Sequence, residues 1–195
     1  MFLVIARILG SYLLSTGTPC RLLPKEDFIH GELHKMKIKI YTMGGTIDKT
    51  YFDKKSVYQV GEPQIVTILE EMNVTVDYEC ESLIRKDSLD MTDEDRLLLY
   101  DKISTDSCGH IVITHGTDTM IESAKMVLTI KDKVIVFTGA IRPADFKSSD
   151  AAFNIGSALA AVQILPNGVY IAMNGRIFDP TKVRKNLEFN RFEEI

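Results

Sequence analysis

The stretch KIKIYTMGGTI, residues 37–47, decides the fold class of this chain. Apolar and polar residues alternate over its first seven positions, as in a β-strand, and Gly44-Gly45 predicts a tight turn at the strand's end. Two later runs, HIVIT at 110–114 and VIVFT at 134–138, are short and rich in β-branched residues. Such runs are typical of buried strands in a parallel sheet.

Segments with helical patterns or capping signals separate these strands. We expect helices over 64–73, after Thr92, from the glycine turn that follows HIVIT to about 129, and over 151–165. Further strands are expected over 74–83 and 169–173, and a mobile loop is expected over 48–58. Strands that alternate with helices form βαβ units. The expected fold is therefore α/β: one domain with a mostly parallel sheet flanked by helices in three layers, as in Rossmann-like or flavodoxin-like proteins. Ligands bind such sheets at the carboxyl ends of the strands.

The composition excludes several classes of protein. The 195 residues are 45% hydrophobic and 26% charged, with a formal net charge of −4, which gives no signal for a nucleic-acid partner or a membrane surface. The three cysteines have neither CxxC nor metal-ligand spacing, so we expect reduced thiols and a cytoplasmic protein. The four histidines also lack paired spacing, and we expect no metal and no cofactor.

The first 35 residues differ from the rest of the chain. Their apolar patches are broken by Arg7, Gly10 and Pro19, and neither patch is long enough to span a bilayer, which takes about 20 residues. The order of charged and apolar residues is also not that of a signal peptide. We interpret residues 1–35 as an extension of uncertain order, either loosely docked or translated from upstream of the true start, with a cleaved leader as the alternative. Residues 36–195 form the expected domain.

Polar residues and glycines follow each predicted strand. The groups at these ends are Gly44-Gly45-Thr46, Lys86-Asp87-Ser88, His115-Gly116-Thr117-Asp118, Gly139-Ala140-Ile141-Arg142 and Asn174-Gly175-Arg176. A threonine hydroxyl becomes a nucleophile when a base or a cation lowers the cost of its deprotonation. Backbone N–H groups of a glycine turn can stabilise an oxyanion. The set therefore favours acyl transfer on a small polar substrate.

Four segments together resemble bacterial-type L-asparaginases: TMGGTI at 42–47, HGTDTM at 115–120, FTGAIRP at 137–143 and Ser149-Asp150. The resemblance runs from about residue 37 to 191 and implies the family's N-terminal catalytic α/β domain, with no counterpart of its second, C-terminal domain. It implies hydrolysis of L-asparagine, or a related ω-amide, to L-aspartate and ammonia. It also implies a homodimer or higher homo-oligomer, because a neighbouring subunit completes the site in this family.

The resemblance assigns roles by position. The implied catalytic residues are Thr46, Tyr58, Thr117, Asp118 and Lys185, and the implied substrate-binding residues are Gly45, Asp87, Ser88, Gly116, Thr117 and Asp118. Thr46 is similar to the nucleophile and Tyr58 to the loop tyrosine that activates or orients it. Lys185 resembles the lysine partner of the second threonine, with Lys182 as its rival.

Each of these residues also has a purely structural interpretation. A glycine pair can simply form a turn, a threonine before a helix is usually an N-cap, Tyr58 can be a packing residue, and Lys185 can belong to a solvated basic face. The interpretation as a functional site is favoured because all of these residues lie where a single site at the strand ends requires them. Two alternatives to the enzyme stay open: an amino-acid-binding module without turnover, and an ammonia-producing subunit of an amidotransferase.

Overall fold

The computed structural model of this chain describes residues 36–51 and 58–195. The predicted extension over 1–35 and part of the predicted mobile loop, residues 52–57, lie outside the described residues, as do the side chains of residues 51, 58 and 59. The described residues belong to one compact unit, assigned to residues 34–195.

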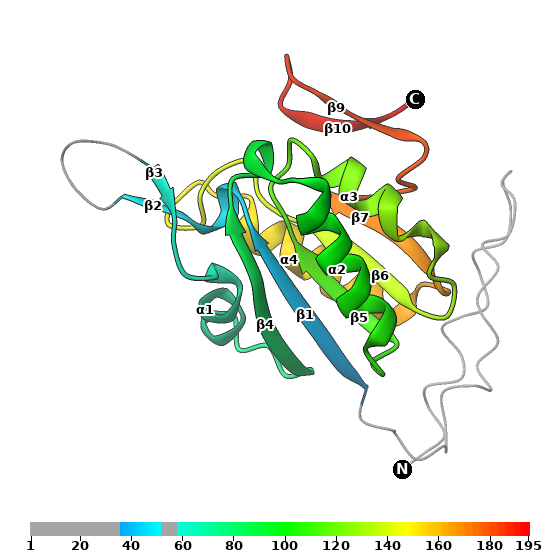
Figure 1. Cartoon of the computed structure of the whole chain (residues 1–195). Coiled ribbons are helices and arrows are strands. Elements are labelled where there is room, and N and C mark those ends of the chain that lie inside the picture. The colour runs from blue at the N-terminus through cyan, green and yellow to red at the C-terminus, as the bar shows by residue number, and fades with distance from the viewer. Residues whose placement is uncertain (1–35, 52–57) are drawn as a thin grey trace, which may run out of the picture. The chain divides into compact units, whose positions relative to one another are not determined.

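A six-stranded sheet with the order β4-β1-β5-β6-β7-β8 runs through this unit (Figure 1). Its strands are β1 (Lys37–Gly44), β4 (Asp77–Lys86), β5 (His110–Thr114), β6 (Val134–Thr138), β7 (Gly168–Met173) and β8 (Arg176–Phe178). The first five strands pair in parallel, and only β8 is antiparallel to its neighbour. The sheet confirms the predicted α/β class and its mostly parallel pairing.

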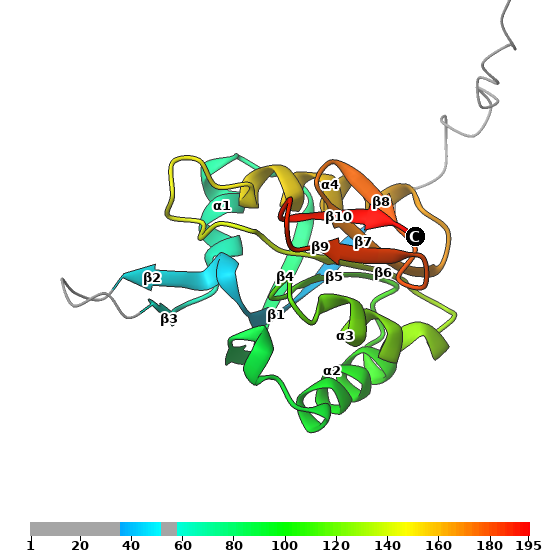
Figure 2. The same ribbon diagram turned by 90° about the horizontal axis from the view of Figure 1, so that it is seen from above.

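Helices cover both faces of the sheet and complete three layers (Figure 2). The helices are α1 (Gln64–Glu71), α2 (Asp93–Thr105), α3 (Met120–Met126) and α4 (Ala151–Ile164). Ile38 and Ile40 of β1 join the apolar cluster that includes α1 and α4, whereas Tyr41 and Met43 join the cluster that includes α2 and α3. Because successive side chains of a strand point to opposite faces, the alternation in KIKIYTM supplies both clusters.

Two expected elements differ in the structure. The strand predicted over 74–83 begins at Asp77, because residues just before it end α1: Asn73 adopts a left-handed φ of 51°, and the N–H of Val74 donates to the carbonyl of Leu69 at 3.0 Å. The segment predicted as a mobile loop contains two short antiparallel strands, β2 (Lys49–Tyr51) and β3 (Tyr58–Val60). Backbone pairing of these residues replaces the solvated loop in that part of the segment.

The strands after β7 were not predicted from the hydrophobic pattern. A two-residue turn, Asn174-Gly175, reverses the chain into β8, and both residues have left-handed φ angles of 53° and 73°. Asparagine followed by glycine is the preferred sequence for such a turn. The chain then forms a separate antiparallel pair, β9 (Val183–Asn186) and β10 (Arg191–Glu194). Figure 1 shows this pair beyond the end of the sheet at which β1 terminates.

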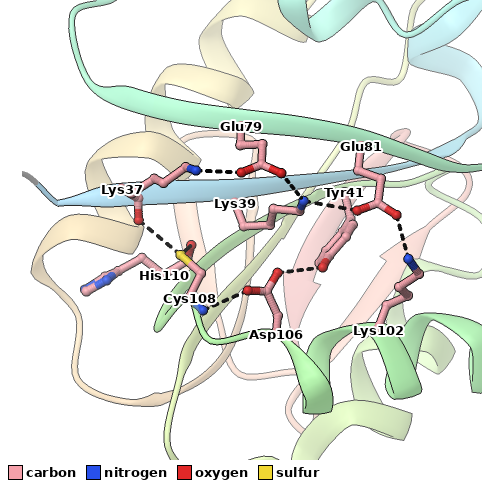
Figure 3. Close-up of polar contacts among 9 residues, drawn as sticks. All are labelled: Lys37, Lys39, Tyr41, Glu79, Glu81, Lys102, Asp106, Cys108 and His110. Carbon is pink, nitrogen blue, oxygen red and sulfur yellow. Dashed lines mark hydrogen bonds and ion pairs between the residues drawn. The ribbon is translucent and has the colours of Figure 1, made fainter.

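Ion pairs join β1 to the edge strand β4 on one face of the sheet (Figure 3). Lys39 Nζ lies 2.8 Å from Glu79 and 3.0 Å from Glu81, and Lys37 Nζ lies 2.6 Å from the other oxygen of Glu79. Lys102 of α2 pairs with Glu81 at 2.8 Å. Lys39 is only 8% exposed, so this polar residue of the KIKIY alternation is covered and paired, whereas the Lys37 side chain is 52% exposed.

These ion pairs predict a specific loss of stability in acid. The hydrogen bonds from Lys37 and Lys39 lower the pKa of Glu79 from 4.5 to about 2, and Lys102 and Lys39 lower that of Glu81. A carboxyl with a lowered folded-state pKa stabilises the fold above its unfolded pKa and loses that contribution as the pH falls. The free energy of unfolding of Glu79→Gln should therefore fall below that of the wild type mainly above pH 4.5, and the difference should shrink toward pH 2.

Urea unfolding at a series of pH values measures this difference. Glu70→Gln changes an exposed glutamate of α1 and serves as the control, because it should keep the wild-type pH dependence. A Glu79→Gln deficit that stays constant from about pH 5 to pH 2 would contradict the assignment of these pairs.

Candidate active site

Three turns at the carboxyl ends of β1, β4 and β5 are in direct contact. A Cβ on Gly45 would lie 2.3 Å from Gly116 Cα, and a Cβ on Gly116 would lie 2.5 Å from the Cβ of Ser88. Gly45 also has a φ of 92°, which L side chains rarely adopt. Both glycines are therefore required by the close approach of the backbones, and they bring three predicted site segments together.

The two predicted catalytic threonines lie in neighbouring turns. Thr42 of β1 pairs in register with Thr114 of β5. Thr46 lies four residues after Thr42, and Thr117 lies three residues after Thr114. Both threonines are therefore at the carboxyl ends of neighbouring strands. Thr46 is partly exposed at the start of a short 3-10 helix, whereas Thr117 is only 3% exposed.

Lys185 connects the second threonine to an acidic group. Its Nζ donates to Thr117 Oγ1 at 2.7 Å and to Asp118 Oδ1 at 2.6 Å. These contacts link residues 68 and 67 positions apart in the chain. The alternative residue, Lys182, has a side chain that is 73% exposed, and its Nζ lies 3.9 Å from Oδ2 of Asp179. The structure therefore brings Lys185, and not Lys182, to Thr117 and Asp118.

The turn after β4 holds Asp87 and Ser88 in different environments. Ser88 is 1% exposed, and its carbonyl accepts a hydrogen bond of 2.8 Å from Thr119 Oγ1, which ties this turn to the Thr117 turn. Asp87 pairs with Lys49 of β2 and accepts the N–H of Leu89. Burial opposes ionisation of Asp87, but these two partners hold its pKa below the usual value. Lys49 was not among the predicted site residues.

Asp48 lies at the start of the segment that carries Tyr58 and is hydrogen-bonded to two residues beyond the end of that segment. Its carboxylate accepts the N–H of Gln64 at 2.8 Å, at the start of α1, and its carbonyl accepts the N–H of Gly61 at 2.8 Å. Burial raises the pKa of Asp48 to about 6. The backbone of Tyr58 lies in β3, paired with Tyr51, and its side chain lies outside the described residues. Its predicted contact with Thr46 therefore stays a prediction.

His115 lies next to the site, but its side chain is buried in the fold. The residue is fully buried, and its Nδ1 lies 2.8 Å from the Gly116 carbonyl. Burial lowers the pKa of His115 to about 4, so the ring is neutral near pH 7. No group of three or more His, Cys, Asp or Glu side chains in the described part of the chain is arranged to hold a metal ion. Within residues 36–51 and 58–195, no helix is both long and apolar enough to cross a membrane.

The contact between Lys185 and Thr117 favours loss of the threonine's hydroxyl proton. A lysine ammonium that contacts a buried threonine hydroxyl stabilises the negative charge that develops when this oxygen loses its proton. Asp118 keeps the ammonium paired, and the partly exposed Thr46 lies in the adjoining turn. The fold and this site define an α/β protein in which two strand-end threonines accompany a lysine–aspartate pair.

The chain belongs to the asparaginase family. The family model described as "Asparaginase, N-terminal" matches residues 37–193, which confirms the resemblance found in the motifs. The chain is 36% identical over 159 residues to "L-asparaginase 2" of Escherichia coli, a match that covers 76% of this chain and 46% of that protein. A structure titled "Probable Cytoplasmic L-asparaginase" from Campylobacter jejuni superposes with a TM-score of 0.70 at 31% identity, over 82% of this chain and 53% of that one.

A shorter match points to a second kind of relative. The chain is 48% identical over 71 residues to one component of the glutamyl-tRNA(Gln) amidotransferase of Methanococcus vannielii, over 35% of this chain and 17% of that protein. Across the longer matches, the chain spans about half the length of the relatives.

The contact between the glycine turns predicts a large cost for added side chains. Gly45→Ala should lower the free energy of unfolding by about 3 kcal/mol, because the positive-φ, extended backbone of Gly45 (φ 92°, ψ −168°) costs roughly 1–3 kcal/mol for an alanine, and overpacking costs a further 1–3 kcal/mol. Gly109→Ala is the matched control, since a Cβ there meets no atom within 4 Å. Urea unfolding of both variants measures the difference, and equal stabilities would show that the two turns do not touch as described.

Proposed function

We propose that this chain hydrolyses L-asparagine, or a related ω-amide, to L-aspartate and ammonia. The observation that carries the proposal is the hydrogen bond of Lys185 to Thr117, together with its ion pair to Asp118. Family membership and the L-asparaginases among the relatives support the same conclusion.

Thr46 is the proposed nucleophile. Its Oγ1 forms a bond to the amide carbon, its proton leaves with the amide nitrogen, and ammonia is released. Water then attacks the resulting ester, which frees aspartate and returns the hydrogen to the threonine oxygen. The position of Thr46 supports this role, because it is partly exposed directly after Gly45, in the turn that contacts Gly116 next to Thr117. Tyr58 is the proposed residue that activates or orients this hydroxyl.

Thr117, Lys185 and Asp118 form the proposed proton-transfer group. The lysine lowers the cost of ionising the Thr117 hydroxyl, and the aspartate holds the lysine in place. A threonine oxygen that exchanges its proton easily can serve the water or the amide in each half of the reaction. The burial of Thr117 strengthens its contact with the ammonium, because water screens the interaction less.

The proposed substrate contacts surround these hydroxyls. Ser88 and Asp118 would hold the α-carboxylate and the α-amino group of the amino acid, respectively. The backbones of Gly45 and Gly116 approach closely enough to leave no room for a side chain between their two turns. Asp87 would bind substrate at the margin of the site, because its ion pair with Lys49 limits its own contact with substrate.

The chain also has features that support a cytoplasmic homo-oligomer. Cys80 and Cys108 are free thiols, as expected in a reducing compartment. Leu187 and Phe189, at the turn between β9 and β10, are 72% and 59% exposed, which favours a second copy of the chain next to the Lys185 strand. Native mass measurement tests this part of the proposal, and a monomeric active species would contradict it.

A component of an amidotransferase is the second candidate function. The short match to part of a glutamyl-tRNA(Gln) amidotransferase supports it. The chemistry at the threonines would be the same, but ammonia would pass to a partner protein. Co-purification of such a partner, with ammonia release that depends on it, would favour this candidate over a free hydrolase.

Two threonine substitutions test the enzyme. Thr46→Ala and Thr117→Ala should each reduce ammonia release from L-asparagine by about 10²-fold or more, because each removes a hydroxyl that takes part in bond formation or proton transfer. Thr75→Ala removes an exposed threonine hydroxyl outside the site and should keep the wild-type rate. A coupled ammonia assay across asparagine, glutamine and related amides measures all of these rates.

The outcomes separate the candidates. A wild-type chain that releases no ammonia from any of these amides contradicts the hydrolase. Calorimetric binding of aspartate and asparagine by such a chain would instead identify the amino-acid-binding module without turnover.

A further inference from the structure

Lys185 lies on a strand that is not part of the six-stranded sheet. Strands β9 and β10 pair only with each other among the described strands, and Lys185 is directly opposite Phe192 in their register. Figure 1 shows the pair beyond the carboxyl ends of the parallel strands. The position of the Lys185 ammonium therefore depends on the contacts that fix this pair of strands to the rest of the domain.

Asn174 makes such a contact at the residue opposite Lys185. Its side-chain Oδ1 accepts the backbone N–H of Phe192 at 2.8 Å, across 18 positions in the chain. The Phe192 side chain is 3% exposed and packs near Phe178, with the ring centroids 6.4 Å apart. Because opposite residues of an antiparallel pair point to the same side, a shift of Phe192 would carry Lys185 with it.

A buried asparagine holds Asn174 in turn. Asn154 of α4 is fully buried, and its Oδ1 accepts the N–H of Asn174 at 3.2 Å. Its Nδ2 donates to the carbonyl of Gly139 at 3.0 Å and to the carboxylate of Asp150 at 2.8 Å. Asn174 is thus fixed against α4 and the turn after β6. The exposed ion pair of Arg176 with Glu194, 3.0 Å long, is a weaker link to the same strands.

Turn chemistry alone accounts for an asparagine at this position but not for the direction of its side chain. A turn asparagine usually bonds to the backbone two residues further on, whereas Oδ1 of Asn174 bonds to a different strand pair. We propose that Asn174 is a positioning residue for catalysis, which holds Lys185 against Thr117 through its hydrogen bond to Phe192. This inference deepens the proposed function and rests on it for its kinetic consequence.

Two substitutions separate the turn from the hydrogen bond. Asn174→Gly keeps the left-handed turn and removes the acceptor, whereas Asn174→Asp keeps the turn and an acceptor oxygen. The kcat of Asn174→Gly for ammonia release should fall by about 10- to 100-fold with KM changed by less than about twofold, because a displacement of about 1 Å costs up to 10²-fold. Asn174→Asp should recover most of the lost kcat.

Asn73→Gly is the matched control. Asn73 is also an exposed left-handed asparagine, with a φ of 51°, and its side-chain amide donates to the carbonyl of Glu71, two residues away. This variant should keep the wild-type kcat. Equal kcat values for Asn174→Gly and the wild type, or an equal loss in both Asn174 variants, would overturn the inference.

Amide hydrogen exchange of Phe192 tests the contact without turnover. Its N–H should be protected in the wild type and in Asn174→Asp, and exchange about tenfold faster or more in Asn174→Gly. Fast exchange in the wild type overturns the inference even if a variant fails to fold. A wild type that releases no ammonia contradicts the proposed function, whereas the exchange result decides the Asn174 contact in either case.

Discussion

The contact between the backbones of Gly45 and Gly116 is the constraint on which the site depends. Parallel pairing of β1 and β5 ends both strands at one level, and the chain must leave each strand through a turn that touches its neighbour. A Cβ on Gly45 would meet backbone atoms of Gly116, and a Cβ on Gly116 would meet the side chain of Ser88. Because both turns are so close, Thr46 and Thr117 emerge side by side, and the Ser88 turn closes the third side. The arrangement of the predicted site residues is therefore a consequence of sheet packing.

The two ends of the same sheet use charge in different ways. At the amino end of β1, lysines and glutamates pair with one another across neighbouring strands (Figure 3), and these contacts stabilise the strand register. At the carboxyl end, Lys185 contacts a threonine hydroxyl as well as a carboxylate. Ion pairs thus join the strands at one end of the sheet, whereas the lysine at the other end contacts a threonine that we propose to be catalytic.

Much of this architecture could be predicted, and the limits have physical causes. The strands around residues 37–47, 110–114 and 134–138 follow from local apolar patterns, and the capping box of Thr92 with Asp95 is also a local signal. The start of β4 was missed because the end of α1 takes up the preceding residues. Lys185 was assigned by resemblance alone, since no periodicity relates it to Thr117, 68 positions away. The Asn174 contact has the same character: the turn is local, but its side-chain partner is set by tertiary packing.

The order of these elements along the chain has a consequence for biosynthesis. All six strands of the sheet and both threonines precede β9, so they leave the ribosome before Lys185 does. Domains generally fold as units during synthesis, and β9 and β10 belong to the same unit as the sheet. The sheet and its glycine turns are therefore synthesised before the lysine that contacts Thr117. The arrival of β9 and β10 then brings Lys185 to Thr117 and Asp118, which belong to an earlier part of the chain.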